Sequence, residues 1–158
     1  SERWEWIGKE VWDQARLEVE EKANYDQPLS ISGYDLDHRM IEIAKANAEE
    51  AGLADFIEFK QMQVKDFRTK EEYGVIVGNP PYGERLGEKK AVEAMYKDMG
   101  KAFAELDTWS VYMLTSNERF EECYGKKATK KRKLFNGFIK TDYYQYWGKR
   151  PPKPNKEK

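Results

Sequence analysis

The chain has 158 residues, the length of one ordinary domain, and a formal net charge of −1. Charged residues make up 36% of the sequence and no apolar run approaches the roughly 20 residues of a membrane span, so we expect a soluble protein. Cys123 and His38 are the only residues of their types, which excludes an internal disulfide and disfavours metal clusters. We therefore expect no metal and a reducing, cytoplasmic location, with Cys123 as a packed thiol rather than a nucleophile.

The first half of the sequence alternates between helix-like and strand-like apolar patterns. Two helices and two strands are predicted in the order helix, strand, helix, strand, at residues 4–24, 29–34, 38–51 and 56–63. In the first helix, the three tryptophans are expected to anchor a core. Asp35 follows the first strand. Asp37 is the expected N-cap of the second helix, and Gly52 its stop.

The second half continues the alternation and ends in a hairpin. The predicted elements are a strand, a long helix, a strand, a short helix and two hairpin strands, at residues 74–78, 89–106, 109–114, 118–124, 131–135 and 138–147. The apolar middle of the strand at 74–78 predicts that both of its faces are covered. The Met and aromatic stripe of the long helix predicts core packing, and Asn136-Gly137 predicts a tight hairpin turn.

These elements predict an α/β fold with a mostly parallel sheet and an antiparallel C-terminal hairpin, over residues 1–148. Residues 149–158 are expected to form a flexible, basic Pro/Lys-rich tail. From residue 126 onward there are 12 Lys or Arg against Asp142 and Glu157, a balance of +10. A basic end of this size indicates a polyanionic partner or, alternatively, a solvated charged surface.

The tetrad of Asn79, Pro80, Pro81 and Tyr82 directly follows a predicted strand, where ligands bind in parallel sheets. An aromatic exocyclic amine is a poor nucleophile because its lone pair is delocalised into the ring. The Asn79 side-chain carbonyl and the Pro80 backbone carbonyl could accept both amine N–H groups and orient the lone pair, while the Tyr82 ring stacks on the base. The competing interpretation is an ordinary Asn-Pro turn. The strand context favours amine methylation.

Candidate cofactor contacts also fall at predicted strand ends, where they would line one edge of the sheet. They are Asp35, Asp37, Gln63, Val64, Asp66, Gly78 and Asn79. A carboxylate at Asp35 can accept hydrogen bonds from both ribose hydroxyls, and Asp37 is the alternative. Gln63 or Asp66 could read an adenine amino group while Val64 or Phe67 packs on the ring, and Gly78 permits close approach. An ordinary polar turn is an equal interpretation of residues 63–67.

The motifs around Asp35, the extension of the tetrad through residues 83–86 and the aromatic end of the hairpin resemble the THUMP-containing guanine-N2 methyltransferases of bacterial 23S ribosomal RNA. The resemblance covers residues 4–147. It implies a class I, Rossmann-like methyltransferase fold, S-adenosylmethionine as methyl donor and a guanine of ribosomal RNA as acceptor. It also implies that Asp35 binds ribose, that Gln63 and Val64 contact adenine, and that Asn79 to Tyr82 form the catalytic loop.

The sequence departs from this family in one respect. It contains neither the first strand with its Gly-rich cofactor loop nor the THUMP domain thought to grip RNA. We therefore expect a carboxyl-terminal part of a longer enzyme whose sheet has an empty centre and which binds the cofactor weakly by itself. The alternatives left open are an adenine-N6 or cytosine-N4 methyltransferase and an RNA-binding module without catalytic activity.

Overall fold

The computed structural model describes residues 4, 6–24, 28–83 and 88–152. Its helices and strands are α1 Lys9–Lys22, β1 Ile31–Asp35, α2 His38–Glu50, β2 Ile57–Gln61, β3 Val75–Gly78, α3 Glu88–Ala102, β4 Ser110–Thr115, α4 Phe120–Tyr124, β5 Lys130–Asn136 and β6 Ile139–Tyr146. Two short 3-10 turns, η1 Ala54–Phe56 and η2 Val64–Asp66, flank β2. The predicted order of helices and strands is confirmed. No helix in these ranges is both long and apolar enough to cross a membrane.

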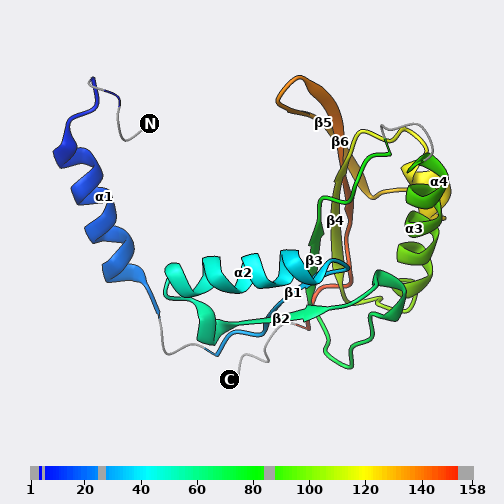
Figure 1. Cartoon of the computed structure of the whole chain (residues 1–158), viewed down its shortest axis with the longest axis horizontal. Helices are drawn as coiled ribbons and strands as arrows, with labels where there is room; N and C mark the ends of the chain where they lie inside the picture. Colours follow the sequence, from blue (N-terminus) through cyan, green and yellow to red (C-terminus); the bar gives the residue numbers. More distant parts are fainter. Residues whose placement is uncertain (1–3, 5, 25–27, 84–87, 153–158) are drawn as a thin grey trace.

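The strands form two sheets rather than one. β1 and β2 pair in parallel, whereas the second sheet has the order β3-β4-β6-β5, in which only β3 and β4 are parallel. Figure 1 shows β1 and β2 running across the view while β3, β4 and β6 stand upright. No strand pairing in the described ranges joins the two sheets. This separation agrees with the expectation of an empty sheet centre.

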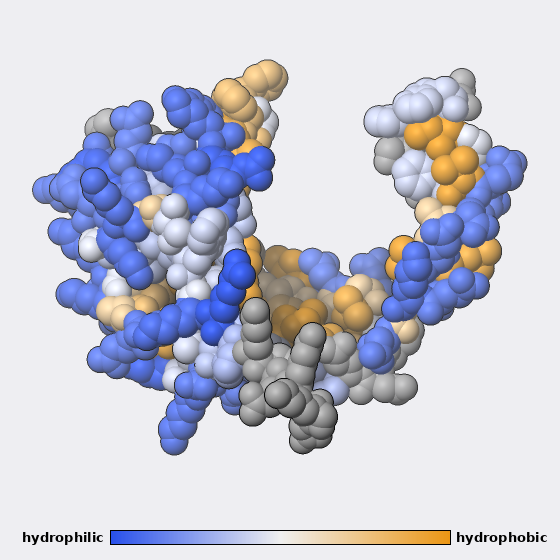
Figure 2. Space-filling view, turned by 180° about the vertical axis from the view of Figure 1, so that it is seen from behind, coloured by the Kyte–Doolittle hydropathy of each residue, from blue (hydrophilic) through white to orange (hydrophobic). Residues whose placement is uncertain are grey.

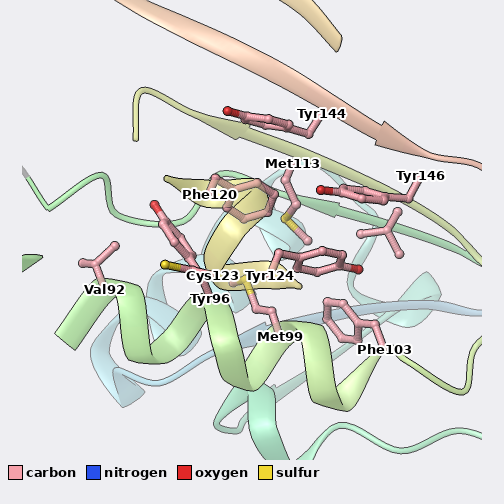
Figure 3. Packing of buried hydrophobic residues seen from close by; sticks show 11 residues of the cluster. Val92, Tyr96, Met99, Phe103, Met113, Phe120, Cys123, Tyr124, Tyr144 and Tyr146 are labelled. Carbon is pink, nitrogen blue, oxygen red and sulfur yellow. The ribbon is translucent and has the colours of Figure 1, made fainter. Parts of the chain in front are cut away.

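The core lies between the four-stranded sheet and the helices α3 and α4 (Figures 1 and 3). Its largest members are aromatic, and Tyr96, Phe120 and Tyr144 are each fully buried. The Phe120 ring lies 4.8 Å from that of Tyr96 and 4.7 Å from that of Tyr144, centroid to centroid. Gly100 permits close packing of the helices, because a Cβ there would collide with the Tyr124 carbonyl. The predicted Met and aromatic stripe of α3 is therefore confirmed as core.

Helix α1 differs from the sequence prediction. It begins at Lys9 rather than at residue 4, and none of its residues is buried. Trp4 and Trp6, which are 51% and 77% exposed, stack on each other instead of anchoring a core. The amphipathic pattern indicated an apolar side correctly, but such a pattern does not specify what covers that side. In Figure 1, α1 stands apart from both sheets.

The prediction that β3 is covered on both faces is wrong for the described structure. Ile76 packs against the core, whereas Val75 and Val77 are 61% and 74% exposed. Successive residues of a strand point to opposite faces, and α3 and α4 lie on one side of this sheet (Figure 1). An apolar run shows that both faces of a strand are apolar, not that both are covered.

Candidate active site

The tetrad forms the loop that leaves the end of β3, as predicted. Along it the exposure changes from residue to residue: Asn79 and Pro81 are exposed, Pro80 is buried and Tyr82 is half-buried. The Tyr82 hydroxyl donates a hydrogen bond of 2.8 Å to the Asn79 side-chain oxygen. The first and last residues of the tetrad thus hold each other. Because a carbonyl oxygen has two lone pairs, Asn79 keeps acceptor capacity for a ligand.

A buried hydroxyl pair supports the loop from below. The Tyr96 hydroxyl, on α3, donates a 2.8 Å hydrogen bond to the Pro81 carbonyl and lies 2.9 Å from the Thr115 hydroxyl. Both side chains are fully buried. Burial raises the pKa of Tyr96, so its hydroxyl stays protonated and remains a donor to Pro81. The position of the loop is therefore fixed by the core.

Two asparagines that were not among the predicted site residues complete the support of Tyr82. The Asn117 side-chain nitrogen donates to the Tyr82 carbonyl at 3.3 Å, and the Asn136 side-chain nitrogen donates to the Tyr82 hydroxyl at 3.3 Å. Asn117 follows the end of β4, so the strand-end rule that selected Asn79 also selects it. Asn136 was read only as a turn residue. Its contact joins residues 54 positions apart in the chain, which no local pattern reveals.

Gly78, at the end of β3, has a packing role in this structure. A Cβ at this position would lie 2.7 Å from the Met113 sulfur on the neighbouring strand. Contacts between real Cβ atoms and neighbours are essentially never that short, so a larger residue would require the end of the Met113 side chain to shift. The predicted role of Gly78 in approach of a cofactor remains a prediction.

The two candidate ribose-binding acids lie together at the end of β1. Asp37 accepts the Arg39 backbone N–H at 2.9 Å as the N-cap of α2, which confirms the capping prediction. Hydrogen bonding to the Arg39 side chain lowers the pKa of Asp37 further. Asp35 is exposed, and one of its carboxylate oxygens accepts the Asp37 N–H at 2.7 Å. Since Asp37 is occupied by α2, Asp35 is the better candidate for a ligand.

The turn after β2 separates into exposed polar and packed apolar residues. Gln63 and Asp66 are exposed, whereas Val64 and Phe67 pack against the core below α3. The Phe67 ring makes T-shaped contacts with the rings of Phe103 and Trp109. The ring centroids are 5.8 Å and 6.1 Å apart, respectively. The apolar pair of this turn therefore attaches the small sheet to the larger one.

Four of the candidate residues fall into two hydrogen-bonded pairs. Asn79 and Tyr82 share one hydrogen-bonded network, and Asp35 and Asp37 share another. Residues 84–86 of the extended motif lie outside the described residues, as do residues 153–158 of the basic tail. Within the described ranges, no group of three or more His, Cys, Asp or Glu side chains could hold a metal ion. Cys123 is buried, and burial raises the pKa of its thiol, in agreement with a packed residue.

The proteins and the family that this chain resembles in sequence are all named as methyltransferases. The family described as UPF0020, RMKL-like, methyltransferase domain matches residues 2–145. The chain is 78% identical over 156 residues to "Putative RNA methyltransferase YpsC" of Bacillus subtilis (strain 168). It is 34% identical over 149 residues to ribosomal RNA large subunit methyltransferase K/L of Shewanella baltica (strain OS185). These matches include 99% and 92% of this chain, but only 40% and 21% of the two relatives.

Solved structures support the same assignment. The crystal structure of SMU.472, a putative methyltransferase complexed with SAH, matches 96% of this chain and 40% of that chain, with a TM-score of 0.84 and 49% identity. A structure described as a predicted N6-adenine-specific DNA methylase from Listeria monocytogenes str. 4b F2365 matches 94% of this chain and 38% of that chain, with a TM-score of 0.80 and 61% identity. The predicted class I methyltransferase fold is confirmed. The chain belongs to the UPF0020 family of RMKL-like methyltransferase domains.

Proposed function

We propose that this chain forms the carboxyl-terminal part of the catalytic domain of an RNA methyltransferase that uses S-adenosylmethionine to methylate guanine N2 in 23S ribosomal RNA. The observation that carries the proposal is the loop of Asn79 and Tyr82, which is held by the core at the end of β3. Membership of a methyltransferase family and the relatives named as RNA and ribosomal RNA methyltransferases support the substrate class.

The loop would act by orienting the amine. The Asn79 side-chain carbonyl and the Pro80 backbone carbonyl would each accept one N–H of the guanine amine, so that its lone pair points towards the reacting carbon. The bond from Tyr82 to Asn79 sets the direction of the Asn79 carbonyl before a substrate arrives. The half-buried Tyr82 ring would support the base by stacking. The base must leave its stack to reach this loop.

The methyl donor fits the residues at the end of β1. S-adenosylmethionine supplies a methyl group on a positively charged sulfur when it is bound, and the structural relative SMU.472 contains SAH. Asp35 would accept the ribose hydroxyls, with its geometry fixed by the bond from the Asp37 N–H. Gln63 or Asp66, both exposed, would contact the adenine amino group. Val64 would contribute by holding this turn in place, because its side chain packs on the core.

Ribosomal RNA would be bound by more than the catalytic loop. Within this chain, the basic β5–β6 hairpin would also bind RNA. In the longer parent enzyme, a THUMP domain would bind it as well. Residues 126–140 contain seven Lys or Arg and no Asp or Glu. Such a segment attracts phosphates independently of base sequence. The choice of nucleotide would then depend on the shape of the RNA and on other parts of the enzyme.

Two alternatives have specific support. Methylation of adenine N6 is favoured by the name of the Listeria structure, and cytosine N4 would present a similar amine to the same loop. A binding module without catalytic activity is favoured by the basic segment of residues 126–140. Methylation of adenine N6 or of cytosine N4 would each yield a methylated nucleoside other than N2-methylguanosine. The binding module predicts that Asn79 is dispensable.

Substitution of Asn79 tests the proposal. In the full-length protein, Asn79→Ala should lower the rate of methyl transfer to ribosomal RNA about 10²- to 10³-fold, the usual loss when a group aimed at a transition state is removed. Binding of SAH, measured by calorimetry, should stay close to wild type. Asn47→Ala, at an exposed position on α2, serves as the matched control. Unchanged methylation by Asn79→Ala would instead support the binding module.

A further inference from the structure

The tip of the β5–β6 hairpin carries exposed aromatic side chains. Phe138 is fully exposed and Phe135 is 73% exposed. Figure 2 shows hydrophobic residues at this tip, next to a hydrophilic surface. Phe138 lies in the two-residue turn between Asn136 and Ile139, which pair with each other, and Gly137 has a φ of +62°. Short hairpin turns are normally built from Gly, Asn and Asp, so the turn geometry does not explain a phenylalanine.

The same tip is attached to the candidate catalytic loop. Asn136, two residues before Phe138, donates its side-chain hydrogen bond to the Tyr82 hydroxyl at 3.3 Å. Two residues of extended chain span at most about 7 Å, so the Phe138 backbone stays within that distance of the Asn136 backbone. This distance corresponds to about two stacked bases, which rise roughly 3.4 Å each. A base held against Tyr82 would therefore leave its strand close to Phe138.

The strand leading to the tip is basic. All residues of β5 are exposed, and they include Lys130, Arg132 and Lys133. Lys131 is different, since it lies 3.5 Å from Glu121 and above the Tyr144 ring. Cations beside exposed aromatic rings are the combination that binds unpaired nucleic acid, because the cations attract phosphates and the rings stack on bases. The charge of this surface therefore favours RNA over a protein or a second copy of the chain.

We propose that Phe138 inserts into the RNA stack at the position that the target base vacates, while Asn136 holds this wedge in register with Tyr82. The inference rests on the proposed function. Extruding a base costs a few kcal/mol of lost stacking, and an apolar side chain inserted between base steps can offset part of that loss. Phe138 is thus assigned a positioning role that matters only when the target base starts inside a stack.

The test compares two RNAs that differ in one feature. Both are fragments of the ribosomal RNA that wild-type protein methylates, one with the target base paired and one with the same base unpaired in a bulge. Phe138→Ala in the full-length protein should lower kcat/KM about 10- to 100-fold on the paired RNA, since stacking on an aromatic side chain is worth about 1–3 kcal/mol per base. On the bulged RNA it should change kcat/KM less than about threefold, because that base needs no extrusion.

Two further variants separate the wedge from general effects. Phe138→Trp keeps an aromatic ring and should retain activity on the paired RNA. Trp147→Ala removes an exposed aromatic residue from the other end of the hairpin, and it should leave kcat/KM unchanged on both RNAs. Fluorescence of 2-aminopurine placed beside the target should rise on binding of wild type and rise less with Phe138→Ala, which reports unstacking directly.

The outcomes are distinguishable. Equal losses on the two RNAs, or no loss on either, would overturn the wedge while leaving the methyltransferase proposal intact. Normal activity on free RNA with slower methylation of assembled ribosomal particles would also overturn it, and would indicate that the tip contacts protein. Failure of the wild-type protein to methylate intact 23S ribosomal RNA, from which the two fragments are chosen, would instead refute the proposed function.

Discussion

The two sheets of this protein differ in how firmly they hold the residues at their ends. The four-stranded sheet shares eleven buried residues with α3 and α4 in one continuous cluster. In the unit of β1, β2 and α2, by contrast, only Ile41 and Ala48 are buried. The loop expected to orient the amine rests on the first region, and Asp35 lies on the second. Methyl transfer would need a rigid amine site, whereas the cofactor side depends on a lightly packed unit.

Among the described residues, the turn after β2 connects these two regions. Val64 and Phe67 pack against the core below α3, and Tyr34 of β1 meets the Phe67 ring at 5.8 Å, centroid to centroid. The small unit is therefore tied to the large one by few apolar contacts. We expect substitutions in the two regions to have effects of different size and extent.

The largest effect is expected in the aromatic core. Phe120→Ala should lower the free energy of unfolding by about 3–5 kcal/mol, because it leaves a cavity between Tyr96 and Tyr144. Ile41→Ala should unfold the small unit locally while the four-stranded sheet persists. Urea denaturation and hydrogen exchange of backbone amides measure the two effects. Global loss of exchange protection in Ile41→Ala would show that the two regions fold as one unit.

Removing the charge of Asp35 should have the next largest effect. Asp35→Asn keeps an acceptor for the Asp37 N–H but replaces a charged acceptor of the ribose hydroxyls. The loss should be about 1.5–3 kcal/mol, or roughly 10- to 100-fold in Kd for SAH in the full-length protein. Calorimetric titration measures it, with Asp55→Asn as an exposed control. If Asp37→Asn weakened binding and Asp35→Asn did not, the ribose role would belong to Asp37.

A smaller effect is expected from the support of the loop. Tyr96→Phe removes the donor to the Pro81 carbonyl and the partner of Thr115, and should cost about 1–2 kcal/mol of stability. It should also lower kcat while leaving KM for the donor unchanged, because the amine site loosens and the Asp35 site does not. Tyr112→Phe, on the face of β4 opposite to the buried Val111 and Met113, is the control. A change in KM for the donor alone would contradict the proposed division between the two regions.

The smallest effect concerns alkaline pH. Burial raises the pKa of Tyr124 to about 12, and it also raises the pKa values of Tyr144 and Tyr146. The pKa of tyrosine in an unfolded chain is about 10, so the folded state keeps protons that the unfolded state loses above that pH. The free energy of unfolding should therefore be insensitive to these groups below about pH 10 and fall as the pH rises towards about 12. Urea midpoints at several pH values should fall less steeply in Tyr124→Phe than in wild type.

Sequence reasoning succeeded where local chemistry decides the structure. The alternation of apolar patterns predicted the helices and strands of the described residues, and Asp37 caps α2 as expected. The hairpin turn lies one residue beyond the predicted Asn136-Gly137, because Asn136 pairs with Ile139. It failed where an apolar surface needed a partner, as in the exposed tryptophans of α1 and the exposed face of β3. Periodicity records which side of an element is apolar. It does not record what, if anything, lies against that side.

The candidate site was predictable to a similar extent. The position of Asn79 after a strand followed from the sequence, but its hydrogen bond with Tyr82 did not. Tyr96 was assigned to the core, and its hydroxyl turned out to support the loop. Asn136 contacts Tyr82, which lies 54 residues earlier in the chain, only because the sheet order β3-β4-β6-β5 brings the hairpin near the loop that follows β3. Contacts of this kind depend on topology, which a single sequence does not specify.

The central proposal is that the loop of Asn79 and Tyr82 orients the exocyclic amine of guanine in ribosomal RNA for methylation. The most direct test is to incubate the full-length protein with isotope-labelled S-adenosylmethionine and unmodified 23S ribosomal RNA, digest the RNA and separate the nucleosides by mass spectrometry. We predict label in N2-methylguanosine, and loss of that label with Asn79→Ala. Label in N6-methyladenosine or N4-methylcytidine, without N2-methylguanosine, would contradict the claim.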